Sequence, residues 1–300
     1  MIIKSFLSAF TLILACQTIT PALNGDPNIP YTLNKPVKTY VVQQPILQEI
    51  SGLAFTNDQK SLVTLQDEAG ILFWLNKNDG SIEKQITFKP DGGDFEDLAV
   101  VGETIYALRS KGVISAVENT KDEKNLKVTV FDKTPLTKTA DTEGLCYDTK
   151  NERLLIACKG ATSDPFSRAI WAFDLKTKQY GTSPVFEINL KQIQAYLTAQ
   201  NADKEEFKKF FGANETEFNF GPSAIAIHPK TGDYYILSSV GKILVVTDAT
   251  GKIKGIEKLQ KKIHTQPEGI VFDTDGTLYI SNEGKNEETP KVYVFSENKK

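Results

Sequence analysis

The sequence predicts an all-β protein, a β-propeller of five four-stranded blades, and three observations support this fold class. A short motif recurs along the chain, short strands of alternating apolar residues follow each copy, and turn residues separate those strands. The copies recur about every 45 residues, apart from one interval of about 80, and about 45 residues is the length of one propeller blade. The chain of 300 residues is 40% hydrophobic, which provides enough apolar material for a core and excludes a mainly disordered protein.

The first 15 residues are predicted to be the signal peptide of a bacterial lipoprotein. Lys4 precedes an apolar run from Phe6 to Ala15. A run of about 10 residues suits a secretory signal and is too short to span a bilayer, which needs about 20. The run ends at Cys16 and resembles a lipobox, in which the cysteine is lipidated and becomes the new N-terminus. An ordinary signal peptide with a cysteine at this place by chance is the alternative.

Residues 16–37 are predicted to be the lipidated cysteine and a flexible tether, because they contain four prolines and no apolar periodicity. The lipid would hold the protein at a membrane surface rather than through it. We expect an extracytoplasmic domain on the periplasmic side of the outer membrane, although no residue decides between the two membranes. Residues 38–300 are predicted to form the single propeller domain.

The recurring motif is predicted to form the first strand of each blade. Second and third apolar strands follow each copy, and a more polar fourth strand closes most units. The fifth unit lacks a fourth strand, and residues 38–44 form an unassigned strand before the first motif. We therefore expect 38–44 to complete the fifth blade and close the ring, which would cover an exposed edge. The five copies are EISGLAF at 49–55, DFEDLAV at 94–100, DTEGLCY at 141–147, GPSAIAI at 221–227 and QPEGIVF at 266–272.

The long interval between the third and fourth motifs is predicted to contain a helical insertion at about 191–212. The third blade uses residues 141–190. In the remainder, Ile193 and Leu197 have helical spacing, as do the phenylalanines at 207, 210 and 211. A sixth, degenerate blade in this interval is the alternative.

A ring of carboxylates is predicted at one mouth of the central channel, because first strands line the axis and second strands end on the same face. Converging carboxylates repel one another and need a cation, a basic partner or raised pKa values. Calcium suits such a site because it accepts many oxygen ligands. The predicted metal ligands are Glu96, Asp141, Glu143 and Glu268, and the predicted ligand-binding residues are Arg109, Lys159, His264 and Glu283. The alternative is structural, with each acid bonded to the neighbouring blade and the charge neutralised by Arg109 and Lys159.

Composition and motifs exclude several function classes. The chain has 35 Lys and Arg against 38 Asp and Glu, a net charge of −3, unlike the basic surface of a nucleic-acid-binding protein. Two histidines and three cysteines leave little for a zinc site. No nucleophile elbow or phosphate loop is present. An extracytoplasmic location would permit a disulfide between Cys146 and Cys158, and the sequence leaves their pairing open.

Over residues 38–300 the chain resembles the SdiA-regulated family of bacterial extracytoplasmic propellers. The resemblance is clearest in QPEG at 266–269 followed by SNEG at 281–284, and in the pair Glu143-Gly144. The sequence departs from the family pattern at Glu96-Asp97, Ser223-Ala224 and Lys159-Gly160. The resemblance implies the propeller fold and the extracytoplasmic location. The chain is similar, more distantly, to calcium-dependent phytase-type propellers.

Three function hypotheses follow. The first is a membrane-anchored monomeric module that binds a small ligand or an envelope protein, with a calcium site at the channel mouth. The second is a calcium-dependent phosphoester hydrolase in which Arg109 and Lys159 bind phosphate. The third is a purely structural envelope protein.

Overall fold

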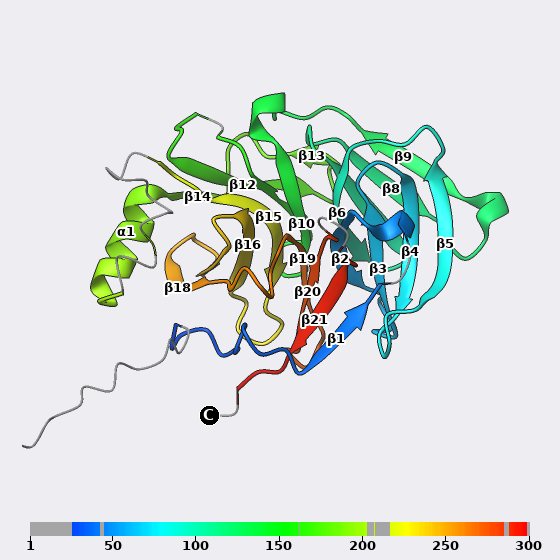
Figure 1. Ribbon diagram of the computed structural model, residues 1–300. Helices are drawn as coiled ribbons and strands as arrows, with labels where there is room; N and C mark the ends of the chain where they lie inside the picture. The colour runs from blue at the N-terminus through cyan, green and yellow to red at the C-terminus, as the bar shows by residue number, and fades with distance from the viewer. Residues whose placement is uncertain are drawn as a thin grey trace, which may run out of the picture.

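The computed structural model describes residues 26–42, 45–161, 163–202, 207, 217–284 and 288–298. The described strands form five antiparallel sheets arranged around a common centre (Figure 1). The predicted five-bladed propeller is therefore confirmed, and the described residues contain no sixth blade. In four of the blades the strands follow one another in the chain, and the motif supplies the first strand in all five.

Four sheets have four strands, as predicted, and the sheet of blade 3 has a fifth. Blade 1 contains β2 (Ile50–Phe55), β3 (Ser61–Gln66), β4 (Gly70–Asn76) and β5 (Ile82–Lys89). Blade 2 contains β6 (Phe95–Val101), β7 (Thr104–Arg109), β8 (Ile114–Glu118) and β9 (Lys127–Phe131). Blade 3 contains β10 (Thr142–Asp148), β11 (Arg153–Cys158), β12 (Ser167–Asp174), β13 (Gln179–Tyr180) and β14 (Phe186–Asn189). Blade 4 contains β15 (Gly221–Ile227), β16 (Tyr234–Val240), β17 (Ile243–Thr247) and β18 (Ile253–Lys258).

Blade 5 is completed by the N-terminal strand, as predicted. It contains β19 (Pro267–Phe272), β20 (Leu278–Asn282), β21 (Lys291–Phe295) and, from the start of the chain, β1 (Lys38–Val41). Strand β1 pairs antiparallel with β21, and Lys38 lies opposite Val294. Figure 1 shows the blue β1 beside the red β21. This pairing closes the ring and covers the edge that β21 would otherwise expose.

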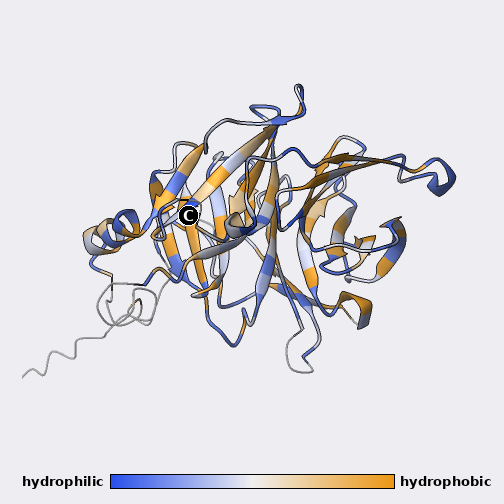
Figure 2. Ribbon diagram, turned by 90° about the horizontal axis from the view of Figure 1, so that it is seen from above, coloured by the Kyte–Doolittle hydropathy of each residue, from blue (hydrophilic) through white to orange (hydrophobic). Residues whose placement is uncertain are grey.

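The core consists of five apolar clusters, each between two successive blades, rather than one central mass. One cluster joins blades 1 and 2, the next joins blades 2 and 3, and the others continue around the ring to blades 5 and 1. Figure 2 shows hydrophobic residues concentrated in the strands and hydrophilic residues in most of the connecting loops. Burial between blades therefore holds each sheet against both of its neighbours.

The insertion after blade 3 begins with helix α1 (Leu190–Ala199), in agreement with the predicted helical segment. Asn189 caps the helix in a reciprocal capping box with Gln192. Ile193 and Leu197 are buried in the cluster between blades 3 and 4. In the second half of the predicted insertion, Phe207 is buried, whereas residues 203–206 and 208–216 lie outside the described residues.

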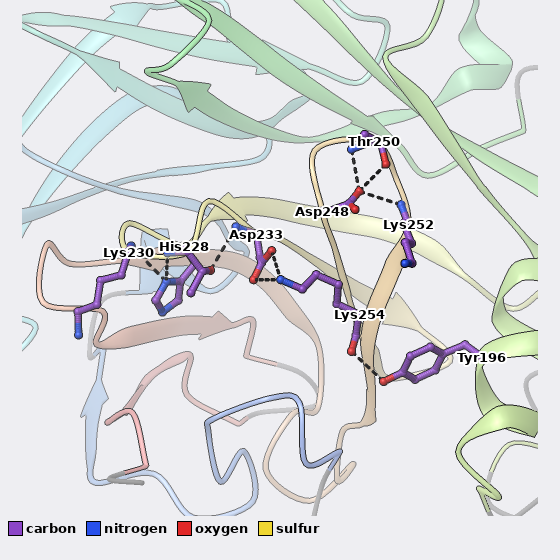
Figure 3. A network of polar contacts seen from close by, with 9 residues as sticks. Tyr196, His228, Lys230, Asp233, Asp248, Thr250, Lys252 and Lys254 are labelled. Atoms are coloured by element: carbon purple, nitrogen blue, oxygen red, sulfur yellow. Dashed lines mark hydrogen bonds and ion pairs between the residues drawn. The ribbon is translucent and has the colours of Figure 1, made fainter.

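Polar contacts join helix α1 to the outer strand of blade 4 (Figure 3). The Tyr196 hydroxyl lies 2.8 Å from the backbone oxygen of Lys254 in β18. The Lys254 ammonium binds both carboxylate oxygens of Asp233, at 2.6 and 2.8 Å. The helix is thus attached to the outer edge of the propeller, away from the first strands at its centre.

Residues 26–37 correct the predicted tether, because they pack against the propeller. Ile29, Tyr31 and Leu33 are buried between blades 4 and 5. The Tyr31 hydroxyl donates to the backbone oxygen of Gly276 at 2.7 Å and lies 2.9 Å from Nε2 of His228. We call residues 26–37 the N-terminal strap. Cys16 and residues 16–25 of the expected tether lie outside the described residues, as does the predicted signal peptide.

Two further findings complete the fold. Cys146 and Cys158 are free thiols, because in the ladder between β10 and β11 they lie opposite Leu155 and Thr142 rather than each other. Among the described residues, no helix has the length and apolar character needed to cross a membrane.

Candidate functional site

A β-bulge recurs at the same motif position in all five blades. In each blade the pairing between the first and second strands shifts at this position. A bulge places an extra residue outside the ladder and redirects its side chain. The bulge therefore frees the third motif residue of each first strand, at the end of the strand where the acids gather. These residues are Ser51, Glu96, Glu143, Ser223 and Glu268.

A small residue follows the bulge in most blades and lets neighbouring first strands approach closely. A Cβ added to Gly269 would lie 2.8 Å from the Ser51 backbone oxygen in blade 1. A Cβ added to Gly144 would lie 3.0 Å from the Ile225 backbone nitrogen in blade 4. The Glu-Gly pairs of the motif thus combine an acid at the bulge with a close contact between blades.

Blade 2 has Asp97 in the position of the small residue, and sequence reasoning did not assign it a role. Asp97 is 2% exposed. Its carboxylate accepts hydrogen bonds from the backbone nitrogens of Leu98 and, across the blade boundary, Leu145, both at 2.7 Å. It fills the space beside Gly52, where an added Cβ would overlap its oxygen. The signal in the sequence was an acid at a position otherwise occupied by glycine or alanine.

Five of the predicted site carboxyls gather around one lysine, and we call this group with Lys159 the hub cluster. The Lys159 ammonium donates to the Glu143 carboxylate at 2.8 Å, and it also acts electrostatically on the other four. Blades 2, 3 and 5 supply the acids. They are Glu96, Asp141, Glu143, Glu268 and Glu283.

The hub cluster holds carboxyls whose pKa values are far above the ordinary range for glutamate. Burial raises the pKa of Glu96 to about 9, with repulsion from Glu143 and Asp94 as smaller causes. Burial raises the pKa of Glu268 to about 8, and Glu143 adds repulsion. The pKa values of Glu143 and Glu283 rise to about 7 for the same first cause, against the opposing effect of Lys159. A single lysine therefore leaves much of the repulsion uncompensated.

The acidic surface continues from the hub cluster onto blade 1. Asp67 and Glu49 both act on Glu283. Burial, followed by repulsion from Glu49, raises the pKa of Asp67 to about 6. The amide of Gln66 joins the two, because its nitrogen donates to Asp67 at 2.9 Å and to Glu49 at 3.3 Å.

Blade 4 contributes hydroxyl groups in place of acids. Ser239 hydrogen-bonds to the Glu268 side chain. The Ser223 hydroxyl donates to the backbone oxygen of Pro267 at 2.8 Å. All five blades thus contribute polar side chains to one acidic region.

Two of the predicted ligand-binding residues do not join the hub cluster. His264 is fully buried, because its ring stacks on Phe295 and its Nε2 lies 2.9 Å from the Leu33 backbone oxygen of the N-terminal strap. His264 therefore holds the strap against blade 5, apart from the acids around Lys159. Arg109 acts on Asp91, whose pKa is lowered first by Lys89 and to a smaller extent by Arg109.

The predicted calcium ligands share one electrostatic environment but form no ready metal site. In the part of the chain that the structure describes, no group of three or more His, Cys, Asp or Glu side chains is placed to hold a metal ion. Lys159 provides an internal positive charge among these acids instead.

Comparisons with known proteins agree with this architecture. The family model described as SdiA-regulated matches residues 34–164 and 187–286. No curated protein matches the chain. Among solved structures, glutaminyl cyclase of Myxococcus xanthus is 12% identical with a TM-score of 0.58, over 87% of this chain and 95% of that one. Virginiamycin B lyase of Staphylococcus aureus is 12% identical with a TM-score of 0.46, over 86% and 69%. At this identity the first likeness concerns the fold alone.

Proposed function

The chain belongs to the SdiA-regulated family, and from that premise we propose that it is an extracytoplasmic lipoprotein whose propeller binds a positively charged ligand at the hub cluster. The single observation that carries this proposal is the set of five carboxyls gathered around Lys159. A second positive charge would lower the repulsion among these groups and favour their ionised forms.

The ligand class is a cation with oxygen-seeking chemistry. Calcium is the inorganic candidate, because it binds carboxylates together with hydroxyl and backbone oxygens. An organic ammonium group is the other candidate, because it donates several hydrogen bonds to carboxylates. Calcium and an ammonium group would bind the same carboxylates. The proposed ligand is therefore any cation that binds carboxylate oxygens.

Thermal melting and calorimetric titration at pH 8 test the proposal, with calcium chloride and butylamine as probes. A ligand that binds the native state must raise the melting temperature. We expect at least one probe to do so, and we expect Glu143→Gln and Glu268→Gln to weaken its binding at least about fivefold. The matched control is Glu103→Gln, because Glu103 is exposed and pairs with Lys121 at 2.7 Å outside the hub cluster. No response to either probe would refute the proposal.

The phosphoester hydrolase hypothesis has weaker support than cation binding. It needs Arg109 and Lys159 together on a phosphate, yet Lys159 bonds to Glu143 and Arg109 acts on Asp91. The acids of the hub cluster would also repel a phosphate. Calcium-dependent hydrolysis of phosphomonoesters that disappears in Glu143→Gln would reverse this preference. The structural hypothesis has less support because one lysine serves five carboxyls.

The membrane anchor is part of the proposal and rests on the sequence around Cys16. We expect the native protein to fractionate with membranes and to incorporate labelled fatty acid. A Cys16→Ser variant that still incorporates the label would contradict anchoring at this residue.

A further inference from the structure

A cavity of about 520 Å³ lies on blade 1 beside the acidic surface, and no role has been assigned to it so far. Its walls come from the turn around Ile46 and Glu49, the end of β3 with Glu68, the start of β4 with Ile71, and the loop after β5. We call this cavity the blade-1 pocket. Its volume falls within the usual range of about 300–1,000 Å³ for small-molecule sites.

The polar walls of the blade-1 pocket are held in place by the backbone. The backbone nitrogen of Gly93 donates to the backbone oxygen of Glu68 at 3.0 Å. The backbone nitrogen of Phe95 donates to the backbone oxygen of Asp67 at 2.6 Å. Gly92 has a φ of 67°, and a Cβ there would lie 2.5 Å from the Glu68 oxygen. Only glycine allows this close approach. The backbone contacts therefore fix the two loops that line the pocket in the ligand-free protein, so the pocket is preorganised.

The charge of the blade-1 pocket is negative. Lys89 pairs with Asp91 at 2.7 Å. Among the described residues, neither Glu49 nor Glu68 has a cation within ion-pair distance. Two of the acidic residues that line this cavity therefore have no positive partner in the described part of the chain, which favours a cationic occupant.

The same pocket has an apolar side. Ile46 is 42% exposed although it is a large hydrophobic residue, and the partly buried Ile71 also lines the cavity. Covering such side chains is favourable in proportion to the apolar area removed from water. A bare metal ion would leave both isoleucines exposed, whereas an organic cation would cover them.

Glu49 connects the blade-1 pocket to the hub cluster. It lines the pocket, and it also acts electrostatically on Glu283. An ammonium group near Glu49 and Glu283 could thus belong to a molecule whose remaining atoms lie on Ile46 and Ile71.

We propose that the blade-1 pocket binds the apolar body of an organic ammonium ligand whose charge lies between Glu49 of the pocket and Glu283 of the hub cluster. This inference rests on the proposed cation-binding function and narrows its ligand class from any cation to an amine with an aliphatic or aromatic chain. Its occupant is a small molecule rather than a protein surface.

Calorimetric titration at pH 8 with three probes tests this inference. Two of the probes each differ from the first in one feature. The probes are 4-phenylbutylamine, butylamine, which lacks the ring, and 4-phenylbutanoate, which reverses the charge. We expect 4-phenylbutylamine to bind about tenfold or more tightly than butylamine, since the added phenyl group removes more apolar area from water. We expect no binding of 4-phenylbutanoate.

Pocket variants locate the binding. We expect Ile46→Ser and Glu68→Gln each to weaken the binding of 4-phenylbutylamine at least about fivefold. Ile46→Ser should weaken the binding of butylamine less, because butylamine has less apolar area to cover. Val130→Ser is the apolar control, because Val130 is 54% exposed on β9. Equal affinities of the two amines would overturn the pocket assignment while the proposed function stands, and so would an unaffected Ile46→Ser variant. Tight binding of 4-phenylbutanoate would overturn the choice of an amine. If neither amine nor calcium binds, the proposed function itself fails.

Discussion

Asp97 shows how one side chain joins three blades at the centre of the ring. It lies on blade 2, fills the space beside Gly52 of blade 1, and accepts a hydrogen bond from Leu145 of blade 3. A buried donor that loses its acceptor keeps its full desolvation cost. The central position of Asp97 therefore makes it more important for stability than its place in a repeated motif suggests.

Asp97→Ala should lower the free energy of unfolding by about 2–4 kcal/mol, because two backbone N–H groups lose their acceptor and a cavity forms. Urea denaturation measures this change. Asp132→Ala, at an exposed position, is the control and should stay within about 0.5 kcal/mol of the wild type. Equal stability of the two variants would show that Asp97 does not join the blades.

The hub carboxyls make stability depend on pH. Their pKa values in the folded protein lie above the ordinary value of 4.5 for glutamate, up to about 9 for Glu96. The folded state therefore holds more protons than the unfolded state. The stability that protonation provides is complete below about pH 4.5 and is lost as the pH rises through 7 to 9.

Glu268→Gln should reduce this loss, because glutamine stays neutral. We expect the wild type to lose stability between pH 6 and pH 9, and the variant to lose at least about 1 kcal/mol less. Urea denaturation at three pH values measures both proteins, with Glu103→Gln as the exposed control. Parallel pH profiles for the wild type and Glu268→Gln would contradict the burial of an ionisable group at this position.

The N-terminal strap is an element held by both histidines of the chain. His228 contacts the Tyr31 hydroxyl, and His264 contacts the Leu33 backbone oxygen. Burial lowers the pKa of both rings, and that of His264 falls to about 4. Backbone contact with Leu33 opposes this shift, and the charge of Lys242 adds to it. The ring of His264 is therefore neutral at pH 7 while the strap is docked.

Acid should weaken the binding of the strap to the propeller, because the histidines take up protons in the unfolded chain at a higher pH than in the folded protein. The contribution of His264 is present above about pH 6.5 and is lost as the pH falls towards 4. Between pH 7 and pH 5 this group should cost the wild type about 2 kcal/mol. His264→Gln retains an N–H donor for Leu33 and does not titrate. On going from pH 7 to pH 5, its stability in urea denaturation should therefore rise relative to that of the wild type by about 2 kcal/mol, whatever the other groups contribute to both proteins. An unchanged slope would contradict the assignment.

The whole molecule is a closed ring in which every blade is buried against two others. The cluster between blades 5 and 1 includes Tyr40 and Val42, which belong to the N-terminal segment. Without that segment β21 would be an open edge, and two of the five clusters would lose part of their apolar surface. Closure should therefore decide the stability of the entire domain.

Two truncated chains test closure. A chain that begins at residue 26 keeps the strap and β1, and we expect it to melt like the chain without its signal peptide. A chain that begins at residue 43 should melt more than about 10 °C lower, because it loses a strand and several buried apolar side chains. Differential scanning calorimetry compares them. Equal melting temperatures would mean that β1 is dispensable for the ring.

Repetition in the sequence determined much of the architecture. Five motif copies indicated five blades, and the missing fourth strand of the last unit indicated closure by residues 38–44. The shared motif position also predicted that Glu96, Glu143 and Glu268 gather, because a repeat places equivalent residues at equivalent points of the ring. Strand periodicity and repeat spacing are local properties, so the sequence records them directly.

Only the tertiary structure decided which neighbours cover each residue. Ile29, Tyr31 and Leu33 alternate as in a strand, yet the prolines around them suggested a tether. Their burial depends on apolar side chains that blades 4 and 5 bring together. The burial of His264 and the blade-1 pocket likewise depend on segments distant in the chain. Local patterns specify the strands and which of their residues face the same side. Which residues are buried, and which distant side chains they contact, follows from how whole blades pack.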